Sequence, residues 1–244
     1  MTEKKIIAVV GATGAQGGGL VRAILADHAG LFTARALTRN ADSDRARELA
    51  SQGAEVIEAD LDDEPSLRKH FDAKGEANAS STALGVPTTF LQTTMYYEAF
   101  LQGQGPHRSG DRELVLSIPM ADKKMALIAG EDIGKTALGV FRRGAEFIGK
   151  TVSIAGTHAT GEGLAATFTE ALGEKVVYRP LTTDRMRASG QPIALEMANM
   201  FKFYSDASDY FTGVRDLDQV REFNPELQTL DSWLIRHKTE IPLD

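Results

Sequence analysis

Three glycines near the start of the chain are spaced to hold a diphosphate. Gly11, Gly14 and Gly17 lie three residues apart in the segment GATGAQGG. In a turn from a strand to a helix, the first glycine permits a tight turn, the second lets the backbone approach a diphosphate, and the third lets the helix pack closely on the strand. The N–H groups and the positive dipole end of the helix then face the phosphates. The predicted cofactor-binding residues of this loop are Gly11, Ala12, Thr13, Gly14, Ala15, Gln16 and Gly17.

The segments on either side of the loop are those that such a site needs. Residues 6–10, IIAVV, are five consecutive apolar residues, which predicts a strand buried on both faces, as in a parallel sheet. After the loop, Leu20, Val21, Ile24 and Leu25 recur with helical spacing. A glycine-rich turn without a ligand is the alternative interpretation, but the position between an apolar strand and an amphipathic helix favours dinucleotide binding.

Arg39 and Asn40 follow the second predicted strand, residues 31–38, where dinucleotide folds contact the adenosine ribose. An acid at that position binds the 2′-hydroxyl of NAD, whereas an arginine accommodates the 2′-phosphate of NADP. The strand ends without a carboxylate, and the arginine fork suits a phosphate. We therefore expect NADP(H) to be preferred over NAD(H). Asp42 and Asp44 close by argue mildly against this, and a solvated surface arginine is the alternative.

A short helix at residues 43–52 and a third strand at residues 54–58 complete the first half of the predicted site. Asp60 and Leu61, at the carboxyl end of that strand, are placed to hold an adenine. We interpret the following Asp62 and Asp63 as charges at the start of a helix near Pro65, where they meet its positive dipole end.

Composition limits the classes of function. The chain has 244 residues, 27 Lys and Arg against 34 Asp and Glu, and no cysteine. A net charge of −7 without a dense basic run makes nucleic acid or an anionic membrane surface a poor expectation as a partner. Without cysteine there are no disulfides or thiolate chemistry, and the five histidines lack metal-ligand spacing. We expect no signal peptide or membrane span, and hence a cytoplasmic protein.

The motifs together resemble the NmrA-like family of atypical short-chain dehydrogenases, and the resemblance runs from Ile6 to about Leu243. The segments that carry it are GATGAQGG, TRN, ADLDD, HFDAKGE, GVPTTF, MYYEAF, EDIGKTALG and NPELQTLDSWL. The resemblance implies a Rossmann-type doubly wound parallel sheet in an α/β fold, binding of NADP(H), and a role as a redox sensor or regulator, with reductase relatives.

The chain departs from that family before HFDAKGE. Pro65 to Lys69 run straight into His70, so two central βα units, each of about 30 residues, have no counterpart and the sheet is shortened. We expect the strand at residues 87–94 to pair beside the first strand in their place.

The resemblance also suggests residues for the nicotinamide half of the site. Short-chain dehydrogenases use a tyrosine and a lysine four residues apart on one helix. Here the corresponding pair is His70 and Lys74, so the tyrosine is absent. His70 could donate a proton, and Lys74 could hold the ribose, although a structural histidine is the alternative. The resemblance places Tyr96, Tyr97, Glu98 and Ala99 at the nicotinamide, with an aromatic core under a loop as the alternative.

The rest of the chain predicts a second, smaller lobe. We expect residues 1–94 to form the dinucleotide-binding domain and residues 95–244 a substrate- or partner-binding lobe interleaved with it. Residues 102–112 are expected to form a polar loop that could act as a lid. Further predicted strands and helices are strands at 114–118, 125–129, 150–155 and 175–180 and helices at 131–143, 157–172, 186–190, 195–204 and 230–238.

Three hypotheses of function follow from the sequence. The first is an NADP(H)-binding sensor or regulator with a regulatory protein as partner. The second is an NADPH-dependent quinone or carbonyl reductase, with His70 or Tyr97 as the proton donor. The third is a shortened form that has kept only an interaction role.

Overall fold

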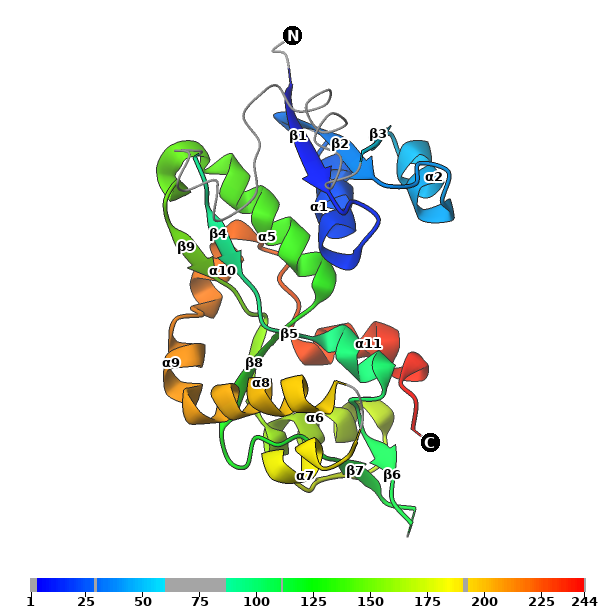
Figure 1. Ribbon diagram of the computed structural model, residues 1–244, viewed down its shortest axis with the longest axis vertical. Helices are drawn as coiled ribbons and strands as arrows, with labels where there is room; N and C mark the ends of the chain where they lie inside the picture. The colour runs from blue at the N-terminus through cyan, green and yellow to red at the C-terminus, as the bar shows by residue number, and fades with distance from the viewer. Residues whose placement is uncertain (1–3, 29, 60–86, 111, 191–192, 244) are drawn as a thin grey trace. The chain divides into compact units, whose positions relative to one another are not determined.

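A computed structural model of the chain describes residues 4–28, 30–59, 87–110, 112–190 and 193–243 (Figure 1). The chain divides into two units. Unit 1 consists of Met1–Gln92, Gly130–Val152 and Glu222–Pro225, and unit 2 consists of Thr93–Ala129, Ser153–Arg221 and Glu226–Asp244. Two segments from the second half of the sequence therefore return to the unit that carries the glycine loop. Among the described residues, no helix has the length and apolar character needed to cross a membrane.

Unit 1 is built on a three-stranded parallel sheet. Its strand order is β1-β2-β3, in which β2 pairs with both neighbours. Ile7 and Val9 are buried, whereas Ile6 is 53% and Val10 is 42% exposed, so β1 is buried on one face and not on both as predicted. The elements of this unit are β1 (Lys5–Val10), α1 (Ala15–Ala26), β2 (Phe32–Thr38), α2 (Asp44–Ser51), β3 (Glu55–Glu58), β4 (Phe90–Gln92), α5 (Gly130–Arg142), η2 (Gly144–Phe147) and β9 (Thr151–Ser153).

Glycines hold α1 and α5 in close backbone contact. A Cβ at Gly134 of α5 would collide with backbone atoms of Gly19 and Leu20 in α1, so only a glycine fits where the helices cross. The buried Asp132 accepts a hydrogen bond of 3.2 Å from Asn224 Nδ2. The segment 222–225 is thereby tied to the start of α5, which explains why it belongs to unit 1.

The partner of β4 differs from the sequence expectation. We expected the strand at residues 87–94 to pair beside the first strand, but β4 pairs with β9. The backbone N–H of Phe90 donates to the carbonyl of Lys150, and that of Gly149 donates to the carbonyl of Thr88. A strand about 60 residues away in the sequence therefore supplies the hydrogen bonds, and strand spacing alone does not reveal such a distant partner.

Unit 2 contains two small sheets around the largest hydrophobic core of the described residues. The strand orders are β10-β8-β5 and β11-β7-β6. Its elements are β5 (Met95–Tyr96), η1 (Tyr97–Gln102), β6 (His107–Arg108), β7 (Leu114–Leu116), β8 (Lys124–Ile128), β10 (Thr157–Thr160), α6 (Gly161–Leu172), β11 (Val176–Tyr178), α7 (Thr183–Arg187), α8 (Ala194–Asp206), α9 (Ser208–Gly213), α11 (Leu230–His237) and η3 (Lys238–Glu240). The helix α10 (Leu217–Phe223) continues from this unit into unit 1.

The predicted helix at residues 157–172 is in fact a strand followed by a helix. The strand β10 pairs antiparallel with β8, and α6 begins only at Gly161. Thr160 is the N-cap, because its Oγ1 accepts a hydrogen bond of 3.1 Å from the N–H of Gly163. A threonine is a preferred N-cap residue and so a signal for the start of a helix, but the prediction from apolar spacing did not use it.

His158 lies on β10 with its Nε2 atom buried and without a hydrogen-bond partner among the described residues. Burial lowers the pKa of His158 below its ordinary value of 6.5, and the charges of Lys124 and Arg215 lower the pKa further. The unfolded chain therefore takes up a proton near pH 6.5 that the folded chain takes up only at lower pH. Stability is present above pH 6.5 and is lost as the pH falls from there toward the folded pKa.

We therefore expect the unfolding temperature to fall between about pH 7.5 and about pH 5.5, and to fall less in His158→Leu. Circular dichroism, recorded while the protein is heated, measures the unfolding temperature of the wild type and of His158→Leu at each pH. The control is His28→Leu, the same substitution at a histidine that is exposed. Equal slopes for wild type and His158→Leu would contradict the assignment.

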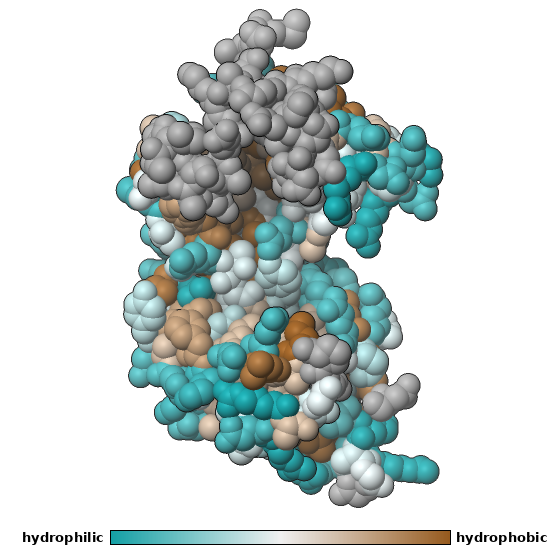
Figure 2. Space-filling model, viewed as in Figure 1, coloured by the Kyte–Doolittle hydropathy of each residue, from teal (hydrophilic) through white to brown (hydrophobic). Residues whose placement is uncertain are grey.

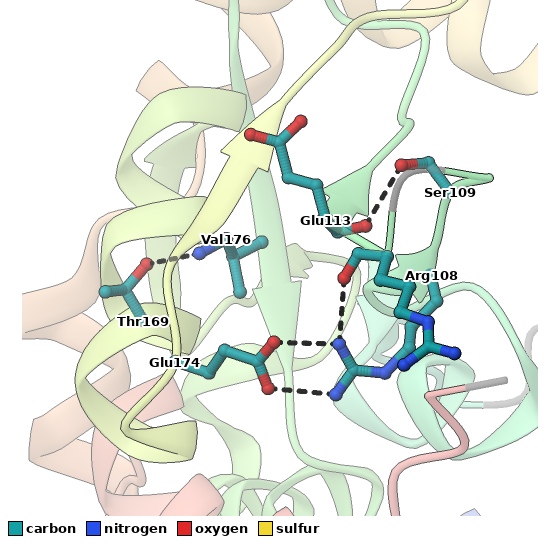
Figure 3. Close-up of polar contacts among 7 residues, drawn as sticks. Arg108, Ser109, Glu113, Thr169, Glu174 and Val176 are labelled. Atoms are coloured by element: carbon teal, nitrogen blue, oxygen red, sulfur yellow. Dashed lines mark hydrogen bonds and ion pairs between the residues drawn. The ribbon is translucent and has the colours of Figure 1, made fainter.

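In the polar segment at residues 102–112, which we expected to form a loop that could act as a lid, the described residues make several polar contacts (Figure 3). Arg108 of β6 donates from both terminal nitrogens to the two carboxylate oxygens of Glu174, at 2.8 Å and 2.9 Å. Arg108 also donates to the carbonyl of Arg112, and the hydroxyl of Ser109 donates to the carbonyl of Glu113. The bidentate arginine–carboxylate pair sets the orientation of the Arg108 side chain and joins β6 to the segment between α6 and β11.

Candidate functional site

The glycine loop of unit 1 has the backbone that its spacing predicts. Gly11 has a φ of +62°, in the left-handed region that favours glycine. A Cβ at Gly17 would lie 2.8 Å from the carbonyl carbon of Gly11 and 2.9 Å from the carbonyl oxygen of Val10. The start of α1 is therefore packed against the end of β1 so closely that no side chain fits between them.

The helix α1 begins at the glycine loop, and within the described part of unit 1 no side chain caps it at its N-cap residue, Gly14. By contrast, Ser43 caps α2 by accepting a hydrogen bond from the N–H of Ala46. The N–H groups at the start of a helix need partners, and a phosphate is well suited to be one.

The turn after β2 presents Arg39 to solvent. Arg39 is exposed, and no carboxylate of the described residues lies within ion-pair distance of it. Asn40 has a structural role, since its Oδ1 accepts a hydrogen bond of 2.9 Å from the N–H of Asp42. Asp44 forms an ion pair with Arg47 of the same helix at 2.9 Å, so its carboxylate is engaged there and not with Arg39. The ordered turn thus leaves the guanidinium of Arg39 available.

A pocket of about 300 Å³ lies beside the glycine loop. Its floor is the loop itself, and two helices supply its side chains. Arg45 of α2 reaches back to the loop, where its Nη1 donates a hydrogen bond of 3.3 Å to the carbonyl of Thr13. The residues that line the pocket are Ala12, Thr13, Gly14, Ala15, Arg22, Arg45, Glu48 and Leu49.

Arg22 and Arg45 are the site residues that the sequence analysis missed. The predicted loop residues 12–15 all line the pocket, and these two arginines add positive charge to it. Glu48 is the acid on the wall, and it accepts a hydrogen bond from Gln52. A signal was present: Arg45 is the second residue of α2, where helices favour acids over bases. A cation in the first turn of a helix suggests a role other than helix stability.

Four predicted site residues lie outside the described residues: Asp60, Leu61, His70 and Lys74. The predicted junction between Lys69 and His70 lies there as well. The expected adenine contacts and the expected histidine–lysine pair therefore stay predictions.

The predicted nicotinamide segment lies in unit 2, and one of its members disagrees with the expected role. Tyr97 is fully buried, and its hydroxyl donates to Thr157 Oγ1 at 2.8 Å. Its ring packs against Trp233 with the ring centroids 5.6 Å apart. Tyr97 is thus a core residue, closed off from a ligand or substrate. Tyr96, Glu98 and Ala99 are partly exposed.

The described residues contain no group of three His, Asp or Glu side chains that could hold a metal ion. The pocket beside the glycine loop instead offers backbone amides and the guanidinium groups of Arg22 and Arg45, which are groups that bind phosphates.

Comparison with known structures agrees with this fold. A structure of NmrA, a negative transcriptional regulator, in complex with NADP has a TM-score of 0.74 and 17% identity, covering 96% of this chain and 95% of that chain. Triphenylmethane reductase from Citrobacter sp., complexed with NADP(H), has a TM-score of 0.70 and 19% identity, and the match covers 96% of this chain and 99% of that chain. At these identities the likeness shows a shared α/β fold of the Rossmann type.

Curated relatives match shorter stretches. The NmrA-like family domain-containing oxidoreductase FrzB of Cladobotryum sp. is 53% identical over 55 residues, which are 22% of this chain and 16% of that protein. The NmrA-like family domain-containing oxidoreductase cpsB of Aspergillus campestris is 33% identical over 103 residues, which are 42% of this chain and 26% of that protein. The matched stretches span well under half of these relatives.

The sequence model of the NmrA-like family matches residues 3–73 and 68–234. The two ranges overlap at residues 68–73, where the sequence analysis placed the junction. Since they cover most of the chain, including the glycine loop and the helices that line its pocket, this protein belongs to the NmrA-like family.

Proposed function

We propose that unit 1 binds NADP(H) at the glycine loop, in preference to NAD(H), and that the protein acts as a sensor or regulator of that cofactor. The observation that carries the proposal is the pocket beside the loop, where the backbone at the start of α1 and the guanidinium groups of Arg22 and Arg45 meet. A dinucleotide supplies the anionic diphosphate that this combination of groups is suited to bind.

The preference for the phosphorylated cofactor rests on charge. β2 ends at Thr38 and is followed by Arg39, so the acid that would bind the 2′-hydroxyl of NAD is absent from that position. Arg45 is held beside Thr13 by its hydrogen bond to the loop. Arg39 in the turn after β2 and Arg45 at the start of α2 thus offer planar donors for a 2′-phosphate. The NADP complexes of NmrA and of triphenylmethane reductase are consistent with this choice.

The regulatory role is supported by the position of the tyrosine considered as a proton donor. Tyr97 is buried and its hydroxyl is also within 3.3 Å of the carbonyl oxygen of Gln228, so it cannot reach a substrate. The short-chain dehydrogenase tyrosine is absent from the predicted pair, where His70 stands. A protein that binds the cofactor without an efficient proton donor would be suited to report cofactor occupancy to a partner. The structural neighbour NmrA is described as a negative transcriptional regulator.

The second candidate is an NADPH-dependent quinone or carbonyl reductase. It is favoured by the curated relatives, which are described as oxidoreductases, and by the fold shared with an NADPH-dependent quinone oxidoreductase of Escherichia coli at a TM-score of 0.66. Consumption of NADPH with a panel of quinones, followed by absorbance, separates the two. Turnover above the rate without protein would favour the reductase, and tight binding without turnover would favour the sensor.

The cofactor preference is tested by replacing one arginine. We expect Arg45→Gln to weaken NADPH binding about tenfold and to leave NADH binding nearly unchanged, because one charge-assisted contact to the 2′-phosphate is lost. Calorimetric titration with each cofactor measures both affinities.

The matched control is Arg47→Gln, on the same helix two residues further on, because Arg47 is paired with Asp44 and does not line the pocket. If Arg45→Gln weakened NADPH and NADH equally, the arginine would contact the diphosphate and not the 2′-phosphate. If neither affinity changed, the proposed role of Arg45 would be wrong.

A further inference from the structure

A second pocket, of about 560 Å³, lies within unit 2. This volume is within the range of about 300–1,000 Å³ that small-molecule sites occupy. Its walls come from α7, α8, the end of η1 and the segment after β7. Much of its lining is apolar, with side chains from Ile118, Met186, Ile193, Met197 and Phe201. In the view of Figure 2, apolar residues are exposed among polar ones on the face of this unit that carries α7 and α8.

The edges of this pocket are fixed by polar contacts. Arg187 of α7 donates a hydrogen bond of 3.0 Å to Asn199 Oδ1 of α8, which ties the two helices together. On the opposite edge, Arg108 is held by its bidentate pair with Glu174, and its neighbour His107 lines the pocket. A pocket with fixed walls binds a ligand without a large ordering cost.

The pocket carries one permanent charge. Among the described residues that line it, Arg185 is the only lysine or arginine, and none is an aspartate or glutamate. The adjacent acid Asp184 pairs with Arg187 at 2.7 Å, and no carboxylate of the described residues is within ion-pair distance of Arg185. Gln102, His107 and Ser117 also line the pocket, and their side chains have no hydrogen-bond partner within the described ranges. An unpaired guanidinium next to apolar walls favours an anion with an apolar body.

We propose that this pocket binds a small apolar monocarboxylate, whose carboxylate pairs with Arg185 and whose hydrocarbon body lies against Met186, Met197 and Phe201. A single negative charge matches the single permanent positive charge. The amide and hydroxyl side chains at the wall serve any further polar group of the ligand. All the residues that line the site belong to unit 2.

The test uses 2-naphthoate and its uncharged counterpart 2-naphthamide as probes of the full-length protein in calorimetric titrations. We expect the wild type to bind 2-naphthoate and to bind 2-naphthamide about tenfold more weakly, because the charge-assisted contact is absent. Arg185→Gln is expected to weaken 2-naphthoate binding about tenfold and to remove the difference between the two probes. Ile193→Asp, which places a negative charge at an exposed lining residue, is expected to abolish binding of 2-naphthoate.

The matched control is Lys202→Gln, because Lys202 lies on α8, is paired with Asp206 and does not line the pocket. It removes the same charge from the same unit and should leave binding unchanged. Arg45→Gln should also leave it unchanged, which would exclude binding of the probe at the glycine loop. No binding of 2-naphthoate, equal binding of the two probes, or equal effects of Arg185→Gln and Lys202→Gln would each overturn the proposal.

Discussion

Replacing Gly17 with alanine is expected to weaken NADPH binding by about 100-fold. A Cβ at this position would collide with the carbonyls of Gly11 and Val10, which are backbone atoms that cannot rotate away. The first turn of α1 would have to move away from the end of β1, and the amides that face the diphosphate would move with it. Loss of two hydrogen bonds to a charged group, at about 1.5 kcal/mol each, corresponds to about 100-fold in affinity.

The matched control for this variant is Gly163→Ala. Gly17 and Gly163 are both the third residue of a twelve-residue helix, α1 and α6 respectively. A Cβ at Gly163 would make only ordinary contacts, the nearest at 3.4 Å from Thr160 Oγ1. Calorimetry measures the affinity of each variant, and circular dichroism shows whether each is folded. A folded Gly17→Ala protein with wild-type affinity would show that the cofactor is not bound at this loop.

The first half of unit 1 could be predicted from the sequence because its signals are local. The apolar run before Gly11 and the polar turn after each strand fix β1, β2, α2 and β3 to within a residue or two, and the glycine spacing places a helix, α1, after the first strand. Gly11 and Gly17 could be assigned separate roles because each solves a different steric problem over a short stretch of chain.

The arginines of the pocket and the pairing of β4 could not be predicted in the same way, because they depend on distant contacts. Arg45 lies on α2, 32 positions after Thr13 of the glycine loop, and only the fold brings the two residues together. β4 pairs with β9 across a longer stretch still. Alternation and helical spacing describe which face of an element is apolar, but they do not say which element covers that face.

Tyr97 shows a different limit of the sequence. Two tyrosines after a strand fit an aromatic wall for a flat ligand and an aromatic core equally well, and the sequence analysis left both open. The structure separates the two residues, because Tyr97 is fully buried and Tyr96 is partly exposed. The deciding factor is the partner of the ring, Trp233, which is contributed by a helix more than 130 residues later.

Trp233 is therefore the residue whose loss should destabilise unit 2 most. We expect Trp233→Ala to lower the free energy of unfolding by about 3–5 kcal/mol, the range for removing a buried aromatic side chain. Trp233 is 2% exposed, packs against Tyr97, and stacks on His237 with the ring centroids 4.4 Å apart. Denaturant unfolding followed by circular dichroism measures the change, because the variant lacks the only tryptophan that fluorescence could report.

The matched control is Ile235→Ala on the same helix, since Ile235 is 75% exposed and its truncation should change the free energy of unfolding by less than about 0.5 kcal/mol. An equal loss from both variants would contradict the role assigned to the buried side chain of Trp233. A large loss from Trp233→Ala alone would show that this side chain organises the core. The buried Tyr97 would then owe its position to Trp233, which accounts for a tyrosine placed near the expected nicotinamide segment but closed to any ligand.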